Sequence, residues 1–254
     1  MKRLIKQITP RQVRRFIARL ERFYASGSVG SFPSQEGAFF SLKKLGWSPK
    51  NCIDVGAYHG EWAKMFLSLF PDSKILMIEA QEGKREILQK AAAESGDKLV
   101  YEMALLGASD GQEVSFIEME TGSSVYEESS SAKRAKTIKK LTSLDTLVKA
   151  HPDFASASAL KIDTQGYELE VLKGCPNLLK LLDVVLLEVS LVNTNKGAPL
   201  FAEVVSFMTS NGFKLFDFCS QIRRKDGVLW QTDLLFIRVD ANIHIPTELT
   251  ENNW

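Results

Sequence analysis

The chain has 254 residues, of which 44% are hydrophobic and 25% charged, and its formal net charge is +1. These fractions are typical of a globular protein and exclude a disordered, collagen-like or disulfide-stapled chain. No apolar run approaches the roughly 18 residues that a membrane span requires, and the basic N-terminus lacks the apolar core of a secretory signal. Three scattered cysteines fit neither a zinc site nor a disulfide framework, so we expect a cytoplasmic protein.

Positive charge is concentrated in the first 24 residues. They hold eight basic residues against one acidic residue, a formal charge of +7, which leaves −6 on the rest of the chain. An acidic body is a poor candidate for binding nucleic acid, so we expect no nucleic-acid partner.

The leading segment has the pattern of a basic amphipathic helix over residues 9–24. Thr9 to Gln12 forms a helix start, and apolar side chains then recur at helical spacing. Such a helix either covers its own domain, the commoner case, or contacts a membrane surface or a second subunit. A Ser/Gly/Pro-rich linker follows to residue 35.

Strands and helices alternate through the first half of the body. We predict helices over 36–45, 61–70 and 80–95, and strands over 51–55, 74–79 and 99–105. This β-α-β-α-β order predicts a parallel sheet with right-handed crossovers. We divide the chain into a leader and linker, 1–35, an α/β domain, 36–240, and a C-terminal tail, 241–254.

The turn after the first of these strands has the pattern of a ligand-binding loop. It runs Asp54-x-Gly56-x-x-x-Gly60, not the G-x-G-x-x-G that a dinucleotide pyrophosphate requires. Glycines there allow positive φ and close approach of a ligand. An acidic residue beside the first glycine suits a cationic, amino-acid-like ligand such as S-adenosylmethionine.

A second acidic residue supports this interpretation. Glu79 ends the next strand, about 20 residues downstream, where a carboxylate takes two ribose hydroxyls. A site for another nucleotide, or a purely structural turn, is the alternative. The predicted cofactor residues are Asp54, Gly56, Ala57, Tyr58, His59 and Gly60 for the methionine half, Glu79 and Ala80 for the ribose, and Met103 and Ala104 for the adenine.

The second half continues the pattern and ends in a hairpin. We predict strands over 113–119, 138–141, 159–163 and 183–189, a mobile loop over the site at 121–131, helices ending near 151, 174 and 211, and an antiparallel pair formed by 213–218 and 229–239.

At this point the sequence resembles the FkbM-type S-adenosylmethionine-dependent methyltransferases. The resemblance is carried by five segments, IDVGAYHG (53–60), MIEAQ (77–81), SLDTLV (143–148), LKIDTQGYELEVLKG (160–174) and VVLLEVS (184–190). It implies a Rossmann-like, three-layer α/β/α class I methyltransferase fold with seven main strands, the last antiparallel. It also implies O-methylation, commonly of a sugar or polyketide hydroxyl. Tyr58, where the family often has Asn, and Glu-Ala-Gln, in place of Glu-Pro, depart from the family pattern.

Three residues are candidates for catalysis. Asp163 ends a buried strand at the same sheet edge and either contacts cofactor or acceptor or caps the following helix. Glu188 lies in an apolar strand, where a carboxylate costs several kcal/mol unless partnered, so we favour a site role. His59 is either the base or a residue whose backbone alone serves the cofactor, and we favour the backbone role.

Acceptor contacts are expected from the end of the domain. Glu168 is either a site residue or a surface acid favoured by the helix dipole. Polar groups of the terminal hairpin suit a sugar, although the arginines there also fit a solvated turn, and its tryptophan either stacks on a sugar or fills the core. The candidates are Glu168, Arg223, Arg224, Trp230, Gln231 and Asp233. No clustered oxygen ligands call for a metal.

The sequence therefore predicts a cytoplasmic O-methyltransferase that uses S-adenosylmethionine on a hydroxyl, such as one of a sugar, glycan or glycolipid precursor. Residues 9–24 would then either bring the enzyme to a membrane-held acceptor through peripheral membrane contact or form a homodimer contact. The alternatives are a non-catalytic, cofactor-binding scaffold subunit and a nicotinamide-dependent oxidoreductase on the same fold, against which the missing G-x-G-x-x-G argues.

Overall fold

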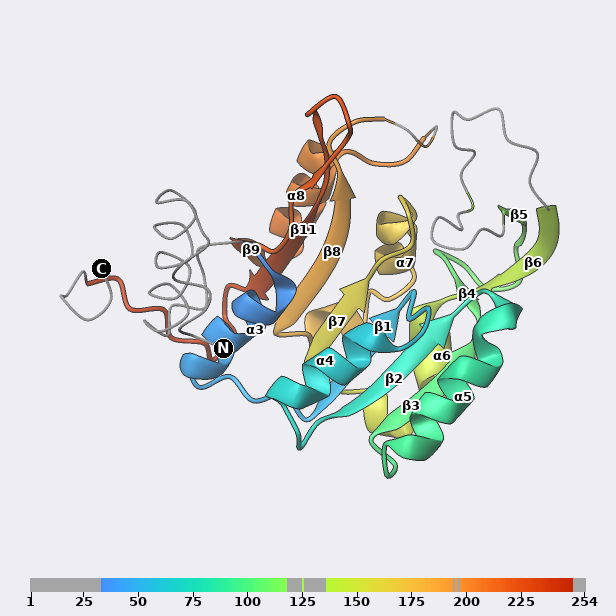
Figure 1. The fold of residues 1–254 in the computed structure, drawn as a ribbon, viewed down its shortest axis with the longest axis horizontal. Helices are drawn as coiled ribbons and strands as arrows, with labels where there is room; N and C mark the ends of the chain where they lie inside the picture. Colours follow the sequence, from blue (N-terminus) through green and yellow to red (C-terminus); the bar gives the residue numbers. More distant parts are fainter. Residues whose placement is uncertain (1–32, 118–124, 126–135, 194, 196, 249–254) are drawn as a thin grey trace, which may run out of the picture.

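The computed structural model describes residues 33–117, 125, 136–193, 195 and 197–248 (Figure 1). The predicted basic helix at 9–24 lies outside the described residues, as do most of the predicted loop at 121–131 and the end of the tail. None of the described helices combines the length and the apolarity of a membrane span.

A single mixed sheet forms the centre of the domain. Five neighbouring strands, in the order β3-β2-β1-β7-β8, are parallel, and β11 then runs antiparallel to both β8 and β9. This confirms the predicted seven main strands with an antiparallel last strand. The bounds are β1 (Asn51–Val55), β2 (Lys74–Glu79), β3 (Leu99–Met103), β7 (Ala159–Ile162), β8 (Val184–Ser190), β9 (Phe213–Phe218) and β11 (Leu229–Arg238).

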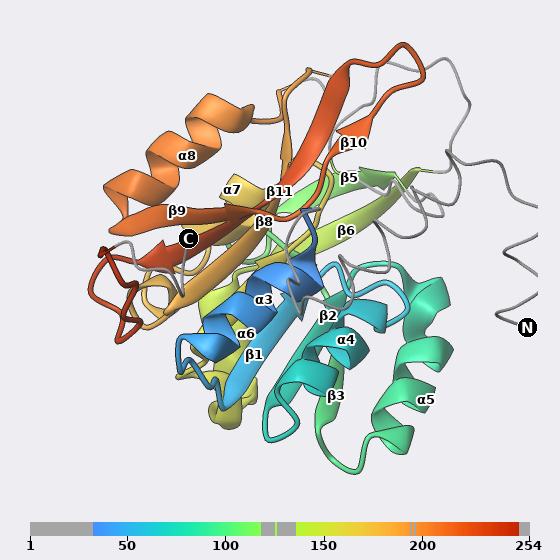
Figure 2. The same ribbon diagram turned by 60° about the vertical axis from the view of Figure 1, so that its left-hand side comes forward.

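Helices cover both faces of the sheet, which gives the predicted three layers (Figures 1 and 2). Side chains alternate along each strand, so each strand contributes to both cores. In β1, for example, Ile53 and Val55 pack into one core and Cys52 into the other. The first core lies under α6 (Leu144–Ala150), α7 (Glu168–Lys173) and α8 (Phe201–Ser210), and the second under α3 (Gln35–Lys44), α4 (Glu61–Leu69) and α5 (Arg85–Glu94).

Two of the predicted elements are each divided into two in the structure. The predicted strand 99–105 ends at Met103, and β4 (Leu105–Leu106) pairs instead with β6 (Lys136–Thr142). Together with β5 (Glu113–Ile117), these strands form a second, three-stranded sheet. The predicted helix 80–95 is divided into a 3₁₀ turn, η1 (Glu82–Lys84), and α5. Hydrophobic periodicity does not mark such changes of partner.

One more short strand and two 3₁₀ turns complete the described elements. Within the hairpin connection, β10 (Ile222–Arg223) pairs with β11. The turns are η2 (Pro152–Phe154), after α6, and η3 (Leu178–Lys180), before β8.

Gly56 joins the ends of three strands at the carboxyl edge of the sheet. Its φ is +72°, and a Cβ at this position would lie 1.9 Å from the carbonyl oxygen of Asp163, which follows β7. The backbone N–H groups of Gly56 and Ala57 donate to the carbonyl of Ile78 in β2, at 2.9 and 3.1 Å. Only glycine fits this close approach, which fixes the loop after β1 against its neighbours.

We expect Gly56→Ala to be much more destabilising than the same change at Gly111. Gly111 has a similar φ of +79°, but no atom lies within 4 Å of a Cβ added there. Gly111→Ala should therefore lower the free energy of unfolding only by the cost of the left-handed backbone, about 1–2 kcal/mol. The overlap at Gly56 adds about 1–3 kcal/mol. Urea unfolding of both variants measures the difference, and equal losses would contradict the close-packing account.

Candidate active site

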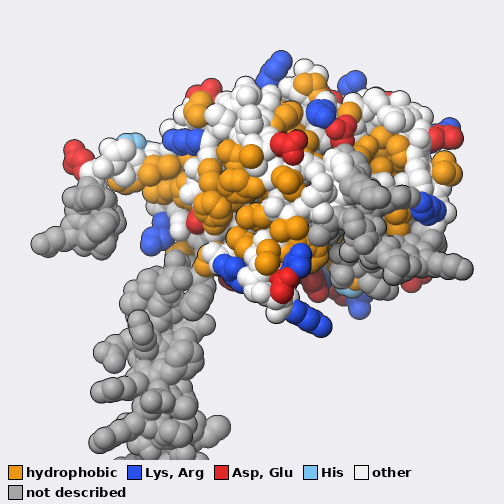
Figure 3. All heavy atoms as spheres, turned by 90° about the horizontal axis from the view of Figure 1, so that it is seen from above, with side chains coloured by type: hydrophobic (Ala, Val, Ile, Leu, Met, Phe, Trp, Pro, Cys, Tyr) orange, Lys and Arg blue, Asp and Glu red, His pale blue; other side chains and the backbone are white. Residues whose placement is uncertain are grey.

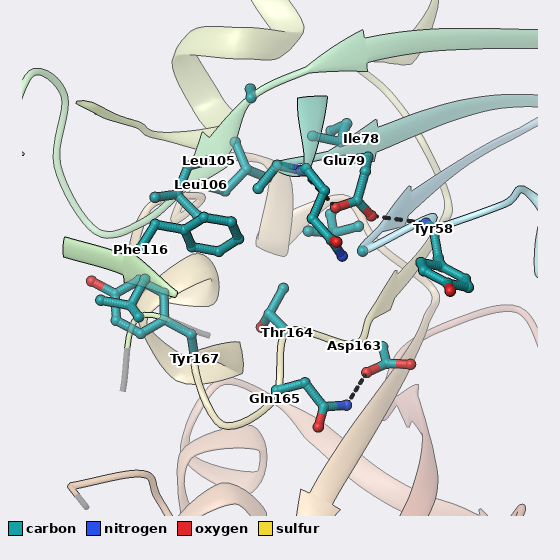
Figure 4. Close-up of a pocket in the computed structure, with 16 residues that line it drawn as sticks. Tyr58, Ile78, Glu79, Leu105, Leu106, Phe116, Asp163, Thr164, Gln165 and Tyr167 are labelled. Carbon is teal, nitrogen blue, oxygen red and sulfur yellow. Dashed lines mark hydrogen bonds between the residues drawn. The ribbon is translucent and has the colours of Figure 1, made fainter. Parts of the chain in front are cut away.

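A cavity of about 250 Å³ opens at the carboxyl edge of the sheet, where the loops after β1, β2 and β7 meet (Figure 4). Polar groups line one part of it and apolar side chains from β4 and β5 the other. The cavity is lined by Val55, Gly56, Tyr58, Ile78, Glu79, Ala80, Gln81, Ala104, Leu105, Leu106, Phe116, Val125, Asp163, Thr164, Gln165 and Tyr167.

Glu79 is held in one orientation by backbone donors. Its Oε2 accepts from the N–H of Tyr58 at 2.8 Å, and its Oε1 accepts from those of Ala80 and Gln81 at 2.9 and 2.8 Å. The carboxylate is buried at the cavity wall. Three charge-assisted hydrogen bonds fix it for a ligand that offers hydroxyl donors.

The apolar part of the cavity differs in one residue from the prediction. Ala104 lines it as expected, but Met103 does not, because its side chain packs against the core on the α4 and α5 side of the sheet. Leu105, Leu106 and Phe116 form the apolar wall instead (Figure 4). Two of these residues belong to β4, the strand that the sequence pattern merged with β3.

Asp54 lies beneath the glycine loop and not in the cavity. Its side chain is fully buried, and Oδ1 forms an ion pair with Nζ of Lys161 at 3.0 Å. The same ammonium donates to the carbonyl of Gly56 at 2.9 Å and lies 3.9 Å from Oδ2 of Asp163. Asp54 therefore supports the loop through Lys161 and is not among the residues that line the cavity, where the prediction had placed it.

Burial and charge act in opposite directions on this pair. Burial raises the pKa of Asp54 above its ordinary value, and the Lys161 ammonium opposes that rise. Burial alone would lower the pKa of Lys161, but the carboxylates of Asp54 and Asp163 outweigh it and the pKa is raised. Lys161 is therefore a fixed cation at neutral pH. It was not among the predicted site residues, although a lysine in an apolar strand carries the same signal as Glu188.

Asp163 and Glu188 are brought together by a glutamine amide. Asp163 follows β7, and Glu188 lies in β8 beside it. Nε2 of Gln165 donates to Oδ1 of Asp163 at 3.1 Å and to Oε2 of Glu188 at 2.8 Å. Asp163 and Gln165 line the cavity, and Glu188 is joined to them by the Gln165 amide without being a lining residue itself. Burial, and then the neighbouring carboxylates, raise the pKa of Glu188 well above its ordinary value.

Glu168 organises the loop after β7 and is not among the residues that line the cavity. Its Oε1 accepts from the N–H groups of Thr164 and Gly166, at 2.9 and 3.0 Å, and from the Thr164 hydroxyl at 3.3 Å. The side chain is buried, so it is not a solvated acid of the helix start either. Burial raises its pKa to about 7, although the backbone donors oppose the rise.

His59 stacks on its neighbour outside the cavity lining. Its ring lies on that of Tyr58, with centroids 3.8 Å apart, and its Nε2 lies 3.4 Å from Nζ of Lys84. That ammonium also lies 4.2 Å from the centroid of the Tyr58 ring. Tyr58 lines the cavity and His59 does not. The backbone role expected for His59 stays a prediction.

The predicted acceptor residues of the hairpin divide into two groups. The guanidinium groups of Arg223 and Arg224 are exposed and bonded within their own turn, to the carbonyl of Gly227 and to Asp226, as expected for a solvated turn. Gln231 and Asp233 are buried beside Glu188. Trp230, on the same strand, is half-buried.

The arrangement combines a rigid acidic group beside an apolar wall with a row of carboxylates at the neighbouring strand ends. From the carboxyl end of the strands, hydrophobic side chains gather in the middle of the visible face and charged groups lie mostly toward its rim (Figure 3). Among the described residues, no group of His, Cys, Asp and Glu side chains is arranged to hold a metal ion.

A comparison with models of protein families identifies one family. The methyltransferase FkbM domain matches residues 54–215, from the end of β1 into β9. No curated protein matches the chain. Among solved structures it is similar to precorrin-6y C5,15-methyltransferase from Geobacter metallireducens GS-15, with 12% identity, 82% of this chain and 93% of that chain covered, and a TM-score of 0.45. It is also similar to magnesium protoporphyrin IX methyltransferase from Synechocystis PCC 6803, solved with bound SAM, with 11% identity, 80% and 79% covered, and a TM-score of 0.47.

We expect Lys161→Met to lower the free energy of unfolding by about 3–5 kcal/mol, because it leaves Asp54 buried without its cation. Adding Asp54→Asn to the same chain should recover part of the loss. The matched control is Lys74→Met, which breaks an exposed pair with Asp153 and should cost less than about 1 kcal/mol. If the two lysine variants lose equal stability in urea, the buried pair is not the constraint we describe.

The free energy of unfolding of Glu168→Gln, relative to that of the wild type, should increase as the pH rises. The folded-state pKa of about 7 exceeds the ordinary 4.5, so the folded protein binds this proton more tightly than the unfolded chain. That contribution is complete below pH 4.5 and is lost as the pH rises to 7. The variant should therefore gain up to about 3 kcal/mol over the wild type between pH 4.5 and 8. Exposed Glu86→Gln should show no such trend, and a flat difference for Glu168→Gln would contradict its burial as an acid.

Proposed function

Because the chain belongs to the FkbM methyltransferase family, whose members transfer the methyl group of S-adenosylmethionine, we propose that its acceptor is a hydroxyl oxygen, most simply one of a sugar or of a glycan or glycolipid precursor. The observation that carries the site assignment is Glu79, fixed by three backbone N–H groups at the wall of a half-apolar cavity.

The residues around the cavity fit this cofactor. Glu79 offers a rigid carboxylate to the two ribose hydroxyls. Leu105, Leu106 and Phe116 offer an apolar wall to the adenine. The glycine loop from Gly56, with Tyr58 at the cavity wall, would hold the methionine half, and the carboxylate of Asp163 lies on that side for its ammonium or the acceptor.

The polar end of the site supports a hydroxyl acceptor. Carboxylates accept hydrogen bonds from hydroxyl groups, and side-chain amides both donate to them and accept from them. Asp163, Glu188 and Asp233 lie together there with Gln165 and Gln231. The bound cofactor supplies an electrophilic methyl group on a sulfonium. The chain positions the acceptor oxygen behind that carbon and accepts its proton on a carboxylate, for which Glu188 is our candidate.

Two alternative functions predict different results in the experiments described below. A non-catalytic scaffold subunit would bind the cofactor without turnover, and a nicotinamide enzyme would bind NAD. The leading segment, with its charge of +7, is proposed to bring the enzyme to an anionic membrane surface or to a second copy of the chain. We also propose that the enzyme is cytoplasmic.

Titration calorimetry of S-adenosylmethionine and S-adenosylhomocysteine tests the site. We expect both to bind, and Glu79→Ala to weaken them at least tenfold, because two hydrogen bonds to a charged group are lost. Glu94→Ala, an exposed acid of α5, is the control and should leave affinity unchanged. NAD and ATP should not bind.

A radiolabel screen with methyl-labelled cofactor then tests the acceptor class. Label in an ether of a sugar hydroxyl supports the proposal. Label on nitrogen or carbon acceptors alone would overturn it, and cofactor binding without transfer to any acceptor would favour the scaffold alternative.

A further inference from the structure

Glutamine side chains engage each acid of the carboxylate row at the sheet edge. Glu188 Oε2 accepts two hydrogen bonds, from Nε2 of Gln165 at 2.8 Å and from Nε2 of Gln231 at 3.1 Å. Asp233 Oδ2 accepts from Nε2 of Gln35, in the first turn of α3, at 2.7 Å. Gln165 also donates to Asp163. Two of the donors therefore converge on a single oxygen of Glu188.

The fold places these acids side by side. Asp233 is directly opposite Glu188 in the β11–β8 register, and Asp163 follows Ile162, which pairs with Leu187. Directly opposed like charges on neighbouring strands are unfavourable. The ionisable groups that face Glu188 are the carboxylates of Asp163, Glu168 and Asp233, which favour its protonated form, and the more weakly acting ammonium of Lys161, which opposes them.

Gln165 is held in a conformation that glycine would favour. Its φ is +55°, and its carbonyl accepts from Nδ2 of Asn195 at 2.8 Å. A non-glycine residue keeps such a backbone only where its surroundings fix it. Here the hydrogen bonds of the Gln165 side-chain amide, together with that from Asn195 to its carbonyl, connect the loop after β7 to β8 and to the segment after β8.

We propose that Gln165 and Gln231 are positioning residues that hold the Glu188 carboxyl group with Oε2 engaged and favour its ionised, proton-accepting form. The proposal rests on the proposed function. In the reaction, the acceptor oxygen forms a bond to the methyl carbon, the carbon–sulfur bond breaks with its electron pair left on sulfur, and the hydroxyl proton passes to the Glu188 carboxylate.

Neutral donors suit this role better than a second cation. An amide N–H stabilises the ionised carboxylate without supplying a full positive charge, so the group remains basic enough to accept a proton. A lysine or arginine in the same place would favour ionisation more strongly and weaken the base. The two amides therefore fix the orientation of the carboxyl group and favour its ionised form against the neighbouring acids.

The experiment is a carbon-13 NMR titration of the Glu188 carboxyl carbon, assigned by its disappearance in Glu188→Gln. It uses the full chain and needs no acceptor. The variants are Gln165→Met and Gln231→Met, which keep side-chain volume and remove the donor. We expect each to raise the pKa of Glu188 by about 0.5–1, since each removes a hydrogen bond to the ionised form.

Gln35→Met is the matched control. It removes an amide donor from Asp233 and none from Glu188, so it favours protonation of Asp233 and should leave the pKa of Glu188 unchanged or lower it. Retained cofactor binding by calorimetry shows that each variant is folded. Should one fail to fold, the other decides the test.

The outcomes separate this proposal from the one on which it rests. An unchanged pKa of Glu188 in both folded variants would overturn the positioning role, whether or not a hydroxyl is methylated. A raised pKa supports it, and with an acceptor in hand the alkaline shift should reappear in the pH profile of kcat. A raised pKa without any transfer to a hydroxyl would leave the two amides their positioning role and overturn only the proposed function.

Discussion

The buried ion pair between Lys161 and Asp54 is the constraint on which the site depends. The Lys161 ammonium on β7 neutralises the Asp54 carboxylate of β1 at 3.0 Å, donates to the Gly56 carbonyl at 2.9 Å and lies 3.9 Å from Oδ2 of Asp163. It thereby connects the strand, the glycine loop and the first acid of the carboxylate row. Removing water from both charges is costly, so loss of either partner leaves the other as an uncompensated buried charge.

The site above this ion pair has two chemically different regions. On one side, Glu79 and the apolar residues of β4 and β5 form a cavity with a single rigid acid. On the other, Asp163, Glu188 and Asp233 form a polar row held mainly by glutamine amides. In the function that we propose, the adenosine occupies the first environment and a hydroxyl acceptor the second, and Asp163 belongs to both. The fold brings them together because parallel strands end at the same edge of the sheet.

Much of this arrangement was predictable from sequence, for identifiable physical reasons. The buried strands and amphipathic helices show their periods directly, and the spacing from Gly56 to Glu79 follows from one β-α-β unit. The partners of a side chain do not show in its local pattern. Asp54 appeared to face a ligand because Lys161, more than a hundred residues away, is invisible at that spacing. Met103 was placed at the adenine wall because the boundary between β3 and β4 carries no signal.

A crystal structure with bound S-adenosylhomocysteine tests the central claim most directly. The account predicts the ribose hydroxyls on the Glu79 carboxylate, the adenine against Leu105 and Phe116, and the Lys161–Asp54 pair intact beneath the loop. A ligand bound elsewhere, or one whose amino group reaches Asp54 after displacing Lys161, would contradict it.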